Sequence, residues 1–346
     1  MKLPRLVWAV IFSLIFNLNF FDTSKAYPPL VQRGLVLNYD LGNSSSYTSG
    51  GTTVSDLANS FNSTVGGTTT NETTTNGKAL VFSGSGYLAM GSSMWGSFSS
   101  SNNYSDSVFM WVYPTGDGVI LDECDSGCGW HDSQIDISGT TMYFSQWNLA
   151  SPWLSTTITL NRWQYVGFVH DTNTLTAYMN GVQVATTSFT RSYPSSSLYF
   201  HVAYPDSTKM GNGGYGRFKF AGMQIYNTAL TATEVKQNFL ATQYRLGQSV
   251  PTGPTATSNL ATQGTTTFTG ISPAPSSYVA NIFSDSSTTQ FVESATVVPA
   301  GTTFSGLQPN TKYYLTVYAA GDQTNTFNSP ETTAISFTTP KYVTTI

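Results

Sequence analysis

The sequence has few charged residues, and this shortage narrows the function classes that fit it. Lysine, arginine, aspartate and glutamate make up 9% of the 346 residues, against roughly 25% in a typical soluble domain. The formal net charge is −4, and no stripe of lysine and arginine runs along the chain. Because nucleic-acid binding depends on basic residues that neutralise phosphates, we expect no nucleic-acid partner.

Cysteine is scarce too, since Cys124 and Cys128 are the only two. A zinc site built from them and His131 would lack a fourth ligand and the usual Cys-x-x-Cys spacing. In an oxidising compartment two cysteines are expected to pair, and Gly127 would ease the closure of so small a loop. We therefore predict a Cys124–Cys128 disulfide, with free thiols and the zinc site as the alternatives.

Long apolar runs are missing except at the start of the sequence. Two basic residues precede the apolar run Leu6–Phe21, and Ser24 and Ala26 offer small residues for cleavage. This pattern predicts a secretory signal peptide over residues 1–26, with an uncleaved membrane anchor as the alternative. We expect a secreted or surface-exposed protein without a membrane span after cleavage.

The residues that take the place of charge favour a β-protein. Aromatic residues make up 14% of the chain, and serine, threonine, asparagine and glycine are abundant. Threonine and aromatic residues suit strands, whereas serine, asparagine and glycine suit turns. Strand-like runs, apolar or alternating, occupy residues 34–41, 81–90, 107–114, 141–148, 162–171, 175–189, 197–204 and 217–227.

Two local signals are specific. Asn180-Gly181 joins two β-rich runs, and this pair is preferred in a type I′ hairpin. Residues 230–243 form the one convincing helix, because Thr231 and Glu234 make a capping box ahead of an apolar face that includes Val235 and Phe239. Many short strands with a single late helix predict an all-β sandwich.

The chain is long enough for two sandwiches, a large one followed by a small one. Residues 27–248 are too many for an immunoglobulin-type sandwich of about 100 residues, so we predict a jelly roll. A linker rich in proline and glycine covers 249–255. A smaller Greek-key sandwich follows over 256–340, where Tyr313 stands at the place of a tyrosine corner, and 341–346 form a tail.

The strand patterns carry a resemblance to known families. "NRWQYVGFVHDTNTLTAYMNGVQV" and "FAGMQIYNTALTATEVKQNF" resemble the hairpin and the closing strand–helix of laminin-G-like, concanavalin A-like jelly rolls. "GLQPNTKYYLTVYA" resembles a fibronectin type III module, with Phe268 in place of its usual tryptophan. The resemblance implies a secreted or surface protein that binds glycans, other proteins or steroids, often with Ca²⁺; some relatives are glucanases.

Catalysis is not expected from the strand that would carry it. Glucanases of this fold place alternate acids on one face of one strand, which gives the two carboxyl groups that glycoside hydrolysis needs. Here Asp136 is flanked by Gln134 and Ser138, which cannot act as carboxyl groups. We therefore predict that the protein is not an enzyme, and we keep a glycoside hydrolase as an alternative because acids can also meet across strands.

Residues 122–132 are the densest polar stretch, and we predict a cystine-pinned loop at one end of the jelly roll. The carboxyl groups of Asp122, Glu123 and Asp125 are candidate Ca²⁺ ligands, although they do not follow the Asp-x-Asp-x-Asp-Gly pattern. The alternative is a solvated acidic loop that holds no ion. Ca²⁺ is the one cofactor that we consider.

We predict that the jelly roll binds a carbohydrate or glycoprotein surface in adhesion, with the second sandwich as a spacer. Aromatic rings beside amide and carboxylate groups suit a shallow glycan site. A structural component of an extracellular surface, filament or virion, with self-assembly, is the alternative. The candidate ligand-binding residues are Trp130, His131, Asp132, Tyr204, Asp206, Asn212 and Tyr215.

Four Asn-x-Ser/Thr motifs lie in the first third of the chain. In a secretory pathway they are acceptors for N-linked glycans on surface loops. A chain this rich in asparagine, serine and threonine also forms such motifs by chance. The predicted acceptors are Asn43, Asn62, Asn71 and Asn103.

Overall fold

The structure, a computed structural model, describes residues 28–74, 77–98, 102–126, 131–193, 196–204, 214–272, 274–322 and 327–342, with the backbone alone at 131–133. Two compact units make up this part of the chain. The larger unit comprises Pro29–Ser249 and Ala320–Ser329, and the smaller comprises Val250–Ala319 and the chain from Pro330 onward. No helix among the described residues is long and apolar enough to cross a membrane.

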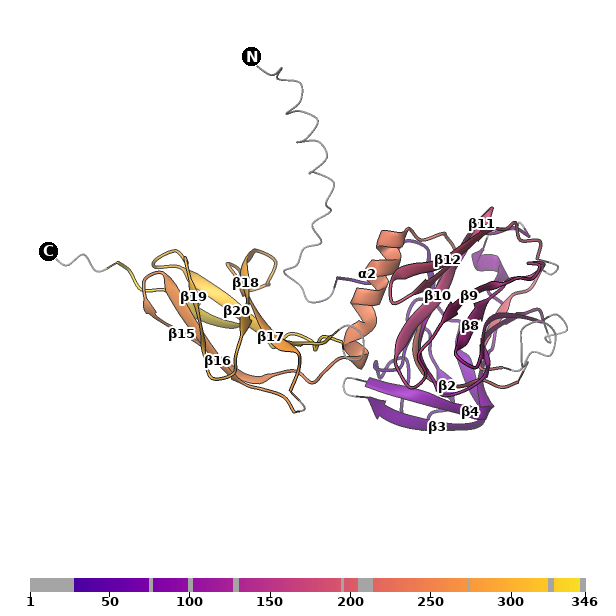
Figure 1. Cartoon of the computed structure of the whole chain (residues 1–346), viewed down its shortest axis with the longest axis horizontal. Helices are drawn as coiled ribbons and strands as arrows, with labels where there is room; N and C mark the ends of the chain where they lie inside the picture. Colours follow the sequence, from indigo (N-terminus) through magenta and orange to yellow (C-terminus); the bar gives the residue numbers. More distant parts are fainter. Residues whose placement is uncertain are drawn as a thin grey trace, which may run out of the picture. The chain divides into compact units, whose positions relative to one another are not determined.

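The larger unit is a β-sandwich, which confirms the predicted jelly-roll fold (Figure 1). Its strands are β1 (Leu35–Asp40), β2 (Thr53–Val54), β3 (Ser63–Thr74), β4 (Gly77–Met90), β5 (Asp106–Pro114), β6 (Gly118–Cys124), β7 (His131–Ser138), β8 (Thr141–Phe144), β9 (Leu154–Thr157), β10 (Gln164–Asp171), β11 (Thr174–Met179), β12 (Val182–Ser188), β13 (Tyr199–Val202) and β14 (Arg217–Tyr226). The strand order is β12-β11-β10-β5-β14-β4-β13-β6-β7-β8-β9, with β1 paired to β14, β3 paired to β4 and β2 paired to β3.

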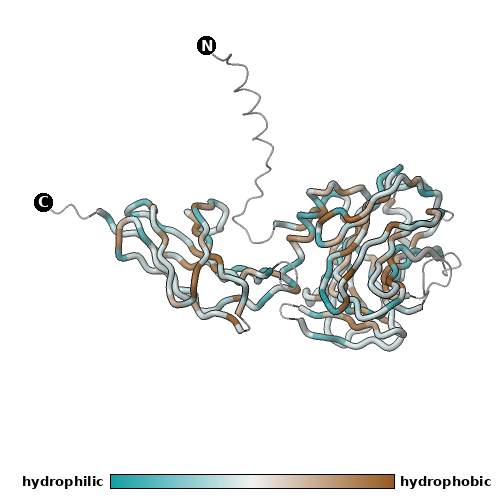
Figure 2. Tube along the Cα trace, in the orientation of Figure 1, coloured by the Kyte–Doolittle hydropathy of each residue, from teal (hydrophilic) through white to brown (hydrophobic). Residues whose placement is uncertain are grey.

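Strand β4 joins the two layers of the sandwich. Its first half pairs with β14, for example Leu80 with Phe220, and Leu88 in its second half pairs with Val202 on β13. Gly84 lies between the two halves with φ +97°, a conformation that favours glycine. The main core fills the space between the layers, and Figure 2 shows hydrophobic stretches along the strands of this unit.

Helix α2 (Ala232–Thr242) covers the outer face of β5, β10 and β11. Thr231 and Glu234 form the predicted capping box, in which the Thr231 hydroxyl accepts from the Glu234 amide. Phe239 packs beside Trp111 of β5 with ring centroids 5.7 Å apart. Two short 3-10 helices, η1 (Trp95–Ser97) and η2 (Gln243–Leu246), complete the helical segments of the described ranges.

The stretch 122–132 is not the loop that we predicted. Asp122 to Cys124 belong to β6, and β7 begins at His131, so that Cys124 pairs with His131 and Glu123 with Asp132. Alternation explains why so polar a sequence forms strands, since Glu123 points into the sandwich, where Tyr104 and Gln134 donate to its carboxylate. We predicted a loop from the cluster of acidic residues because the residues that donate to Glu123 inside the sandwich lie elsewhere in the sequence.

The smaller unit is a second β-sandwich of two sheets. One sheet has the order β15 (Thr252–Leu260), β16 (Gln263–Thr269), β19 (Thr302–Ser305). The other has the order β18 (Phe291–Val297), β17 (Ser277–Phe283), β20 (Lys312–Ala320), β21 (Ile335–Thr338). Strand β15 begins within the stretch that we expected as the linker. The Gln308 amide donates to the Tyr313 hydroxyl at 2.8 Å, as in a tyrosine corner; the fibronectin type III identity itself stays a prediction.

The predicted glycan acceptors differ in their surroundings. Asn62 and Asn71 are exposed, whereas Asn43 and Asn103 are half-buried. The side-chain nitrogen of Asn103 donates to the carbonyl of Thr172 at 2.9 Å. Because a glycan is attached through this nitrogen, Asn62 and Asn71 are the more accessible acceptors, and glycosylation at all four stays a prediction.

Candidate functional site

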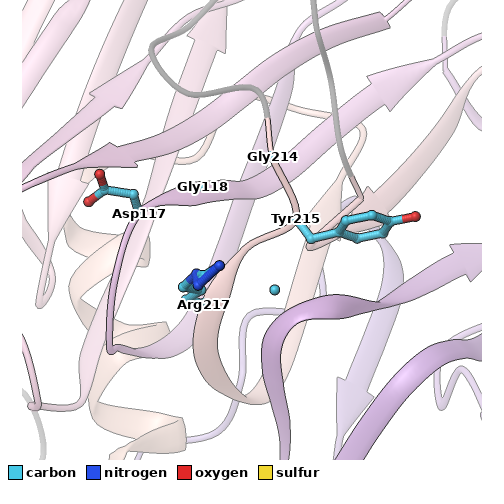
Figure 3. A pocket seen from close by; sticks show the side chains of 6 residues that line it. Asp117, Gly118, Gly214, Tyr215 and Arg217 are labelled. Atoms are coloured by element: carbon cyan, nitrogen blue, oxygen red, sulfur yellow. The ribbon is translucent and has the colours of Figure 1, made fainter.

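A cavity of about 600 Å³ lies beside the point where β4 changes layer. Figure 3 shows Asp117 and Tyr215 on opposite sides of Arg217. Three separate parts of the sequence form the cavity: β4, the start of β6 and the start of β14. The residues that line it are Gly84, Asp117, Gly118, Gly214, Tyr215 and Arg217.

Glycine at 118 is required for this cavity to form. Gly118 has φ +122°, and a Cβ atom there would lie 2.5 Å from the carbonyl oxygen of Tyr215 and 2.9 Å from that of Gly214. The Val119 amide donates to the Gly214 carbonyl at 3.0 Å. The missing side chain therefore lets the segment that carries Tyr215 lie directly against β6.

The Arg217 side chain packs against two further glycines. A Cβ atom at Gly84 would lie 2.9 Å from the guanidinium carbon of Arg217, and one at Gly116 would lie 3.1 Å from its Cδ. In the register of the sheet, Arg217 pairs with Ser83, next to Gly84. The side chain is exposed. At the edge of the cavity its aliphatic stem lies against Gly116 and its guanidinium lies against Gly84.

Three tyrosines meet beside the cavity. The Tyr87 ring contacts the Tyr204 ring edge-on at 5.1 Å between centroids and lies near-parallel to the Tyr215 ring at 6.1 Å. The Tyr87 ring also lies over Gly66, where a Cβ atom would be 2.3 Å from it. All three rings are half-buried, so they combine a packed edge with accessible surface.

Two buried acids lie on the outer face of the neighbouring strands. Leu121, Ile135 and Ile137 belong to the core between the layers. Because neighbouring residues of a strand point to opposite faces, Asp122 of β6 and Asp136 of β7 lie on the outer face, and both are buried. In the register of the sheet, Asp136 lies opposite Val119, three residues before Asp122, so the two acids belong to adjacent strands without being directly opposite each other.

A mixed set of ligand atoms surrounds Asp122. One ligand atom from each of Asp122, Cys124 and His201 lies within 4.8 Å of the others, and Sγ of Cys124 is 3.6 Å from Nδ1 of His201. No cysteine among the described residues is free, and a sulfur held in the predicted disulfide is not the thiolate that zinc binds. Asp122 and His201 alone are too few ligands for a structural zinc site.

The three predicted Ca²⁺ ligands are not brought together. Asp122 lies on the outer face of β6, whereas the Glu123 carboxylate lies on the core side, where it accepts from Tyr104 and Gln134. Asp125 follows β6 and is half-buried. Consecutive strand residues point to opposite faces, and this geometry prevents Asp122 and Glu123 from sharing one cation.

The predicted ligand-binding residues fall into two groups. Tyr204 and Tyr215 both contact the Tyr87 ring, and their role in ligand binding stays a prediction. His131 and Asp132 lie in β7, where only the backbone is described. Trp130, Cys128, Asp206 and Asn212 lie outside the described residues, so the contact centre predicted at Trp130 and the disulfide stay predictions.

Sequence reasoning missed Tyr87, Asp117 and Arg217. Tyr87 lies in a strand that was predicted and was taken as part of the strand pattern alone. Asp117 and Arg217 belong to no motif that the sequence reveals. The register of the sheet brings the segments that carry them to one cavity. The glycines around Arg217 were a partial signal, because glycine inside a strand pattern indicates a close approach of backbone.

The comparisons with known proteins support this description of the larger unit. Residues 82–236 match the family model of the concanavalin A-like lectin/glucanases superfamily. The matched range contains all six residues that line the cavity. No curated protein matches the chain.

Solved structures with a similar fold come from several kinds of protein. Domain 4 of a GH43 extracellular arabinanase from Geobacillus stearothermophilus, in complex with arabinotriose, is 21% identical (TM-score 0.40) over 60% of this chain and 98% of that chain. Trypanosoma rangeli sialidase in complex with sialic acid is 16% identical (TM-score 0.45) over 68% of this chain and 39% of that chain. The binding domain of Botulinum neurotoxin DC, in complex with rat synaptotagmin II, is 10% identical (TM-score 0.46) over 83% and 73%.

These neighbours correct the prediction that the protein is not an enzyme. Two of them are glycoside hydrolases, an arabinanase and a sialidase, so hydrolysis is not excluded for this chain. The prediction rested on Gln134 and Ser138 beside Asp136 on a single strand. Likeness at this identity describes the fold alone and assigns no activity.

Proposed function

We propose that the larger unit binds a carbohydrate at the cavity between Asp117, Tyr215 and Arg217. The contact of Tyr204 and Tyr215 with Tyr87, beside this cavity, carries the proposal. Half-buried tyrosine rings present an apolar face that suits the C–H face of a sugar and a hydroxyl that suits its polar edge. The lectin/glucanase family match over the same residues supports the assignment.

The polar groups of the cavity suit sugar hydroxyls. The Asp117 carboxylate accepts from the Gly139 amide at 2.8 Å, which fixes its direction. Carboxylates accept hydrogen bonds from hydroxyl groups, and guanidinium groups donate them.

A glycan array probed with the full chain tests this proposal. We expect binding to a subset of glycans, with a dissociation constant in the micromolar to millimolar range that is ordinary for shallow sites, and a loss of tenfold or more in Tyr215→Ala. Tyr143→Ala is the control, because Tyr143 is equally half-buried but contacts Trp153. Equal loss in both variants, or no binding to any glycan, would refute the site.

Release of reducing sugars from the bound glycans is measured in the same experiment. Turnover that Asp122→Asn and Asp136→Asn abolish would identify the two outer-face acids as a catalytic pair. Turnover that survives both substitutions would place the chemistry elsewhere. Either result is compatible with carbohydrate binding at the cavity, so the two questions stay separate.

We further propose that the protein is exported and works outside the cell. Residues 1–26 have the pattern of a cleaved signal peptide, and Cys124 and Cys128 are expected to pair in the compartment that export leads to. The smaller unit, as a fibronectin type III-like module, would serve as a spacer. Mature protein that begins at Tyr27 by intact-mass analysis, without reactive thiols after denaturation, is the expected result.

A further inference from the structure

We propose that the cavity selects acidic sugars, with the Arg217 guanidinium as the group that binds the carboxylate or sulfate. This inference rests on the proposed carbohydrate site. It names the ligand class, which the fold and the family match leave open.

Three of the described arginines give their charge to an acid of the chain itself. Arg33 contacts Glu234 at 2.8 Å, Arg191 contacts Asp106 at 3.1 Å, and Arg245 contacts Asp40 at 2.8 Å. Arg162 and Arg217 form no such ion pair within the described ranges, but Arg217 is the one that lies exposed at the rim of the cavity. Its donors therefore face the cavity without a carboxylate to neutralise them.

Arg217 is also positioned before a ligand arrives. Its head lies on Gly84 and its stem on Gly116, and its carbonyl accepts from the amides of Thr115 and Gly116 at 2.9 and 3.1 Å. A guanidinium binds a carboxylate or sulfate through two parallel hydrogen bonds when its plane is fixed. Holding the side chain against glycine backbone reduces the entropy that binding would otherwise cost.

Asp117 does not cancel this charge. Its carboxylate is engaged by the Gly139 amide, and Figure 3 shows it pointing away from Arg217. The cavity thus has a cationic side at Arg217, an anionic side at Asp117 and an aromatic wall at Tyr215. A sugar ring that carries an acidic group at one edge and hydroxyls at the other matches this order.

Three oligosaccharide probes test the inference on the full chain by calorimetry at fixed ionic strength: an oligogalacturonate, a sulfated galactan oligomer and a neutral galactan oligomer. We expect one acidic probe to bind at least tenfold more tightly than the neutral one. Arg217→Met should remove that difference, because it should weaken binding of the acidic probe far more than that of the neutral probe. Arg217→Lys should recover only part of it, because an ammonium cannot form the two parallel bonds. The carboxylated and sulfated probes show which acidic group is preferred.

The control variant is Arg33→Met, which removes the same charge from a residue that contacts helix α2 and not the cavity. It should bind all three probes like the wild type. Neutral and acidic probes that bind equally, or an Arg217→Met variant that weakens both alike, would overturn the acidic-sugar inference and leave the carbohydrate site intact. Absence of binding to every probe and every arrayed glycan would overturn both.

Discussion

Arg191 and Asp106 form an ion pair inside the larger sandwich, where Nη2 of Arg191 donates to Oδ1 of Asp106 at 3.1 Å and neither side chain is exposed. Gln146 accepts from Nε of Arg191 at 3.0 Å, and the guanidinium lies 4.2 Å from the Tyr104 ring centroid. In a chain with so few charges, the pair ties β5 to the segment after β12. Oδ2 of Asp106 and Nη1 of Arg191 are buried without a hydrogen-bond partner within the described residues, so the pair is only partly satisfied and depends on the contact between its two members.

The first prediction concerns Arg191→Met, which keeps the volume and removes the charge. We expect it to lower the free energy of unfolding by about 3–5 kcal/mol, because Asp106 would be left buried without its cation. Denaturant unfolding at neutral pH measures this loss. Adding Asp106→Asn should recover a large part of it. If the double variant is no more stable than Arg191→Met, the pair is not the source of the effect.

The second prediction is a pH dependence from two groups that oppose each other. Burial raises the pKa of Asp106 to about 7 from 3.8, with the Arg191 charge acting against the shift. Burial and the charge of Arg191 lower the pKa of His170 to about 3 from 6.5. The stability from Asp106 is therefore present below about pH 4 and lost as pH rises through 7. That from His170 is present above pH 6.5 and lost as pH falls towards 3.

Between about pH 4 and 6.5 these two contributions have opposite slopes, so the pair leaves the wild-type profile nearly flat. Asp106→Asn should make stability rise with pH across this range, and His170→Gln should make it fall, each by about 1.4 kcal/mol per pH unit for one proton. Thermal or denaturant unfolding of both variants from pH 4 to 7 measures the slopes. Parallel slopes in the two variants would contradict the assignment.

The elements that local sequence specifies were predicted well. The hairpin at Asn180-Gly181 has positive φ at both residues, 50° and 75°, as its turn type requires. Helix α2 begins at the predicted capping box. Strands β5, β10 and β14 are apolar along their length because one face meets the main core and the other meets helix α2 or its neighbours. In each case the signal lies within a few residues of its cause.

What escaped prediction depends on partners far along the chain. Strand β3 is polar on both faces and is held by its long pairing with β4, from Ser63 with Met90 to Thr74 with Gly77. In strand β6 the Glu123 side chain is buried, and the groups that donate to its carboxylate come from β7 and from the segment before β5. The cavity joins Asp117 to Arg217 only through sheet register. Such pairings follow from the topology of the whole unit, which periodicity does not reveal.

The third prediction concerns Gly118→Ala, which changes the position of Tyr215. The added Cβ atom would meet the carbonyls of Tyr215 and Gly214 at 2.5 and 2.9 Å, so this segment must move away from β6. We expect a loss of tenfold or more in glycan affinity, together with a lower melting temperature. Calorimetry and thermal unfolding measure the two effects.

Gly50→Ala is the matched control for this variant. Gly50 also has positive φ, +79°, but a Cβ atom there meets nothing within 4 Å. It should show only the backbone strain, roughly 1 kcal/mol, with glycan affinity close to that of the wild type. If Gly50→Ala reduces affinity as much as Gly118→Ala does, backbone strain alone is responsible and the position of Tyr215 is not what matters.

The fourth prediction concerns Tyr313→Phe in the smaller unit. The Tyr313 hydroxyl accepts from the Gln308 amide at 2.8 Å, and the ring is buried against Phe337. Removing the hydroxyl takes this hydrogen bond away from an amide of the exposed Gln308, which costs about 0.5–1.5 kcal/mol, the net value of an ordinary hydrogen bond. Hydrogen exchange should accelerate at Gln308 first, because the corner opens where its bond is lost.

Tyr314→Phe alters the adjacent side chain, which is half-buried and holds Lys312 over its ring, and should leave Gln308 protected. Unchanged exchange at Gln308 in Tyr313→Phe would mean that packing against Phe337, and not the hydroxyl, holds this corner.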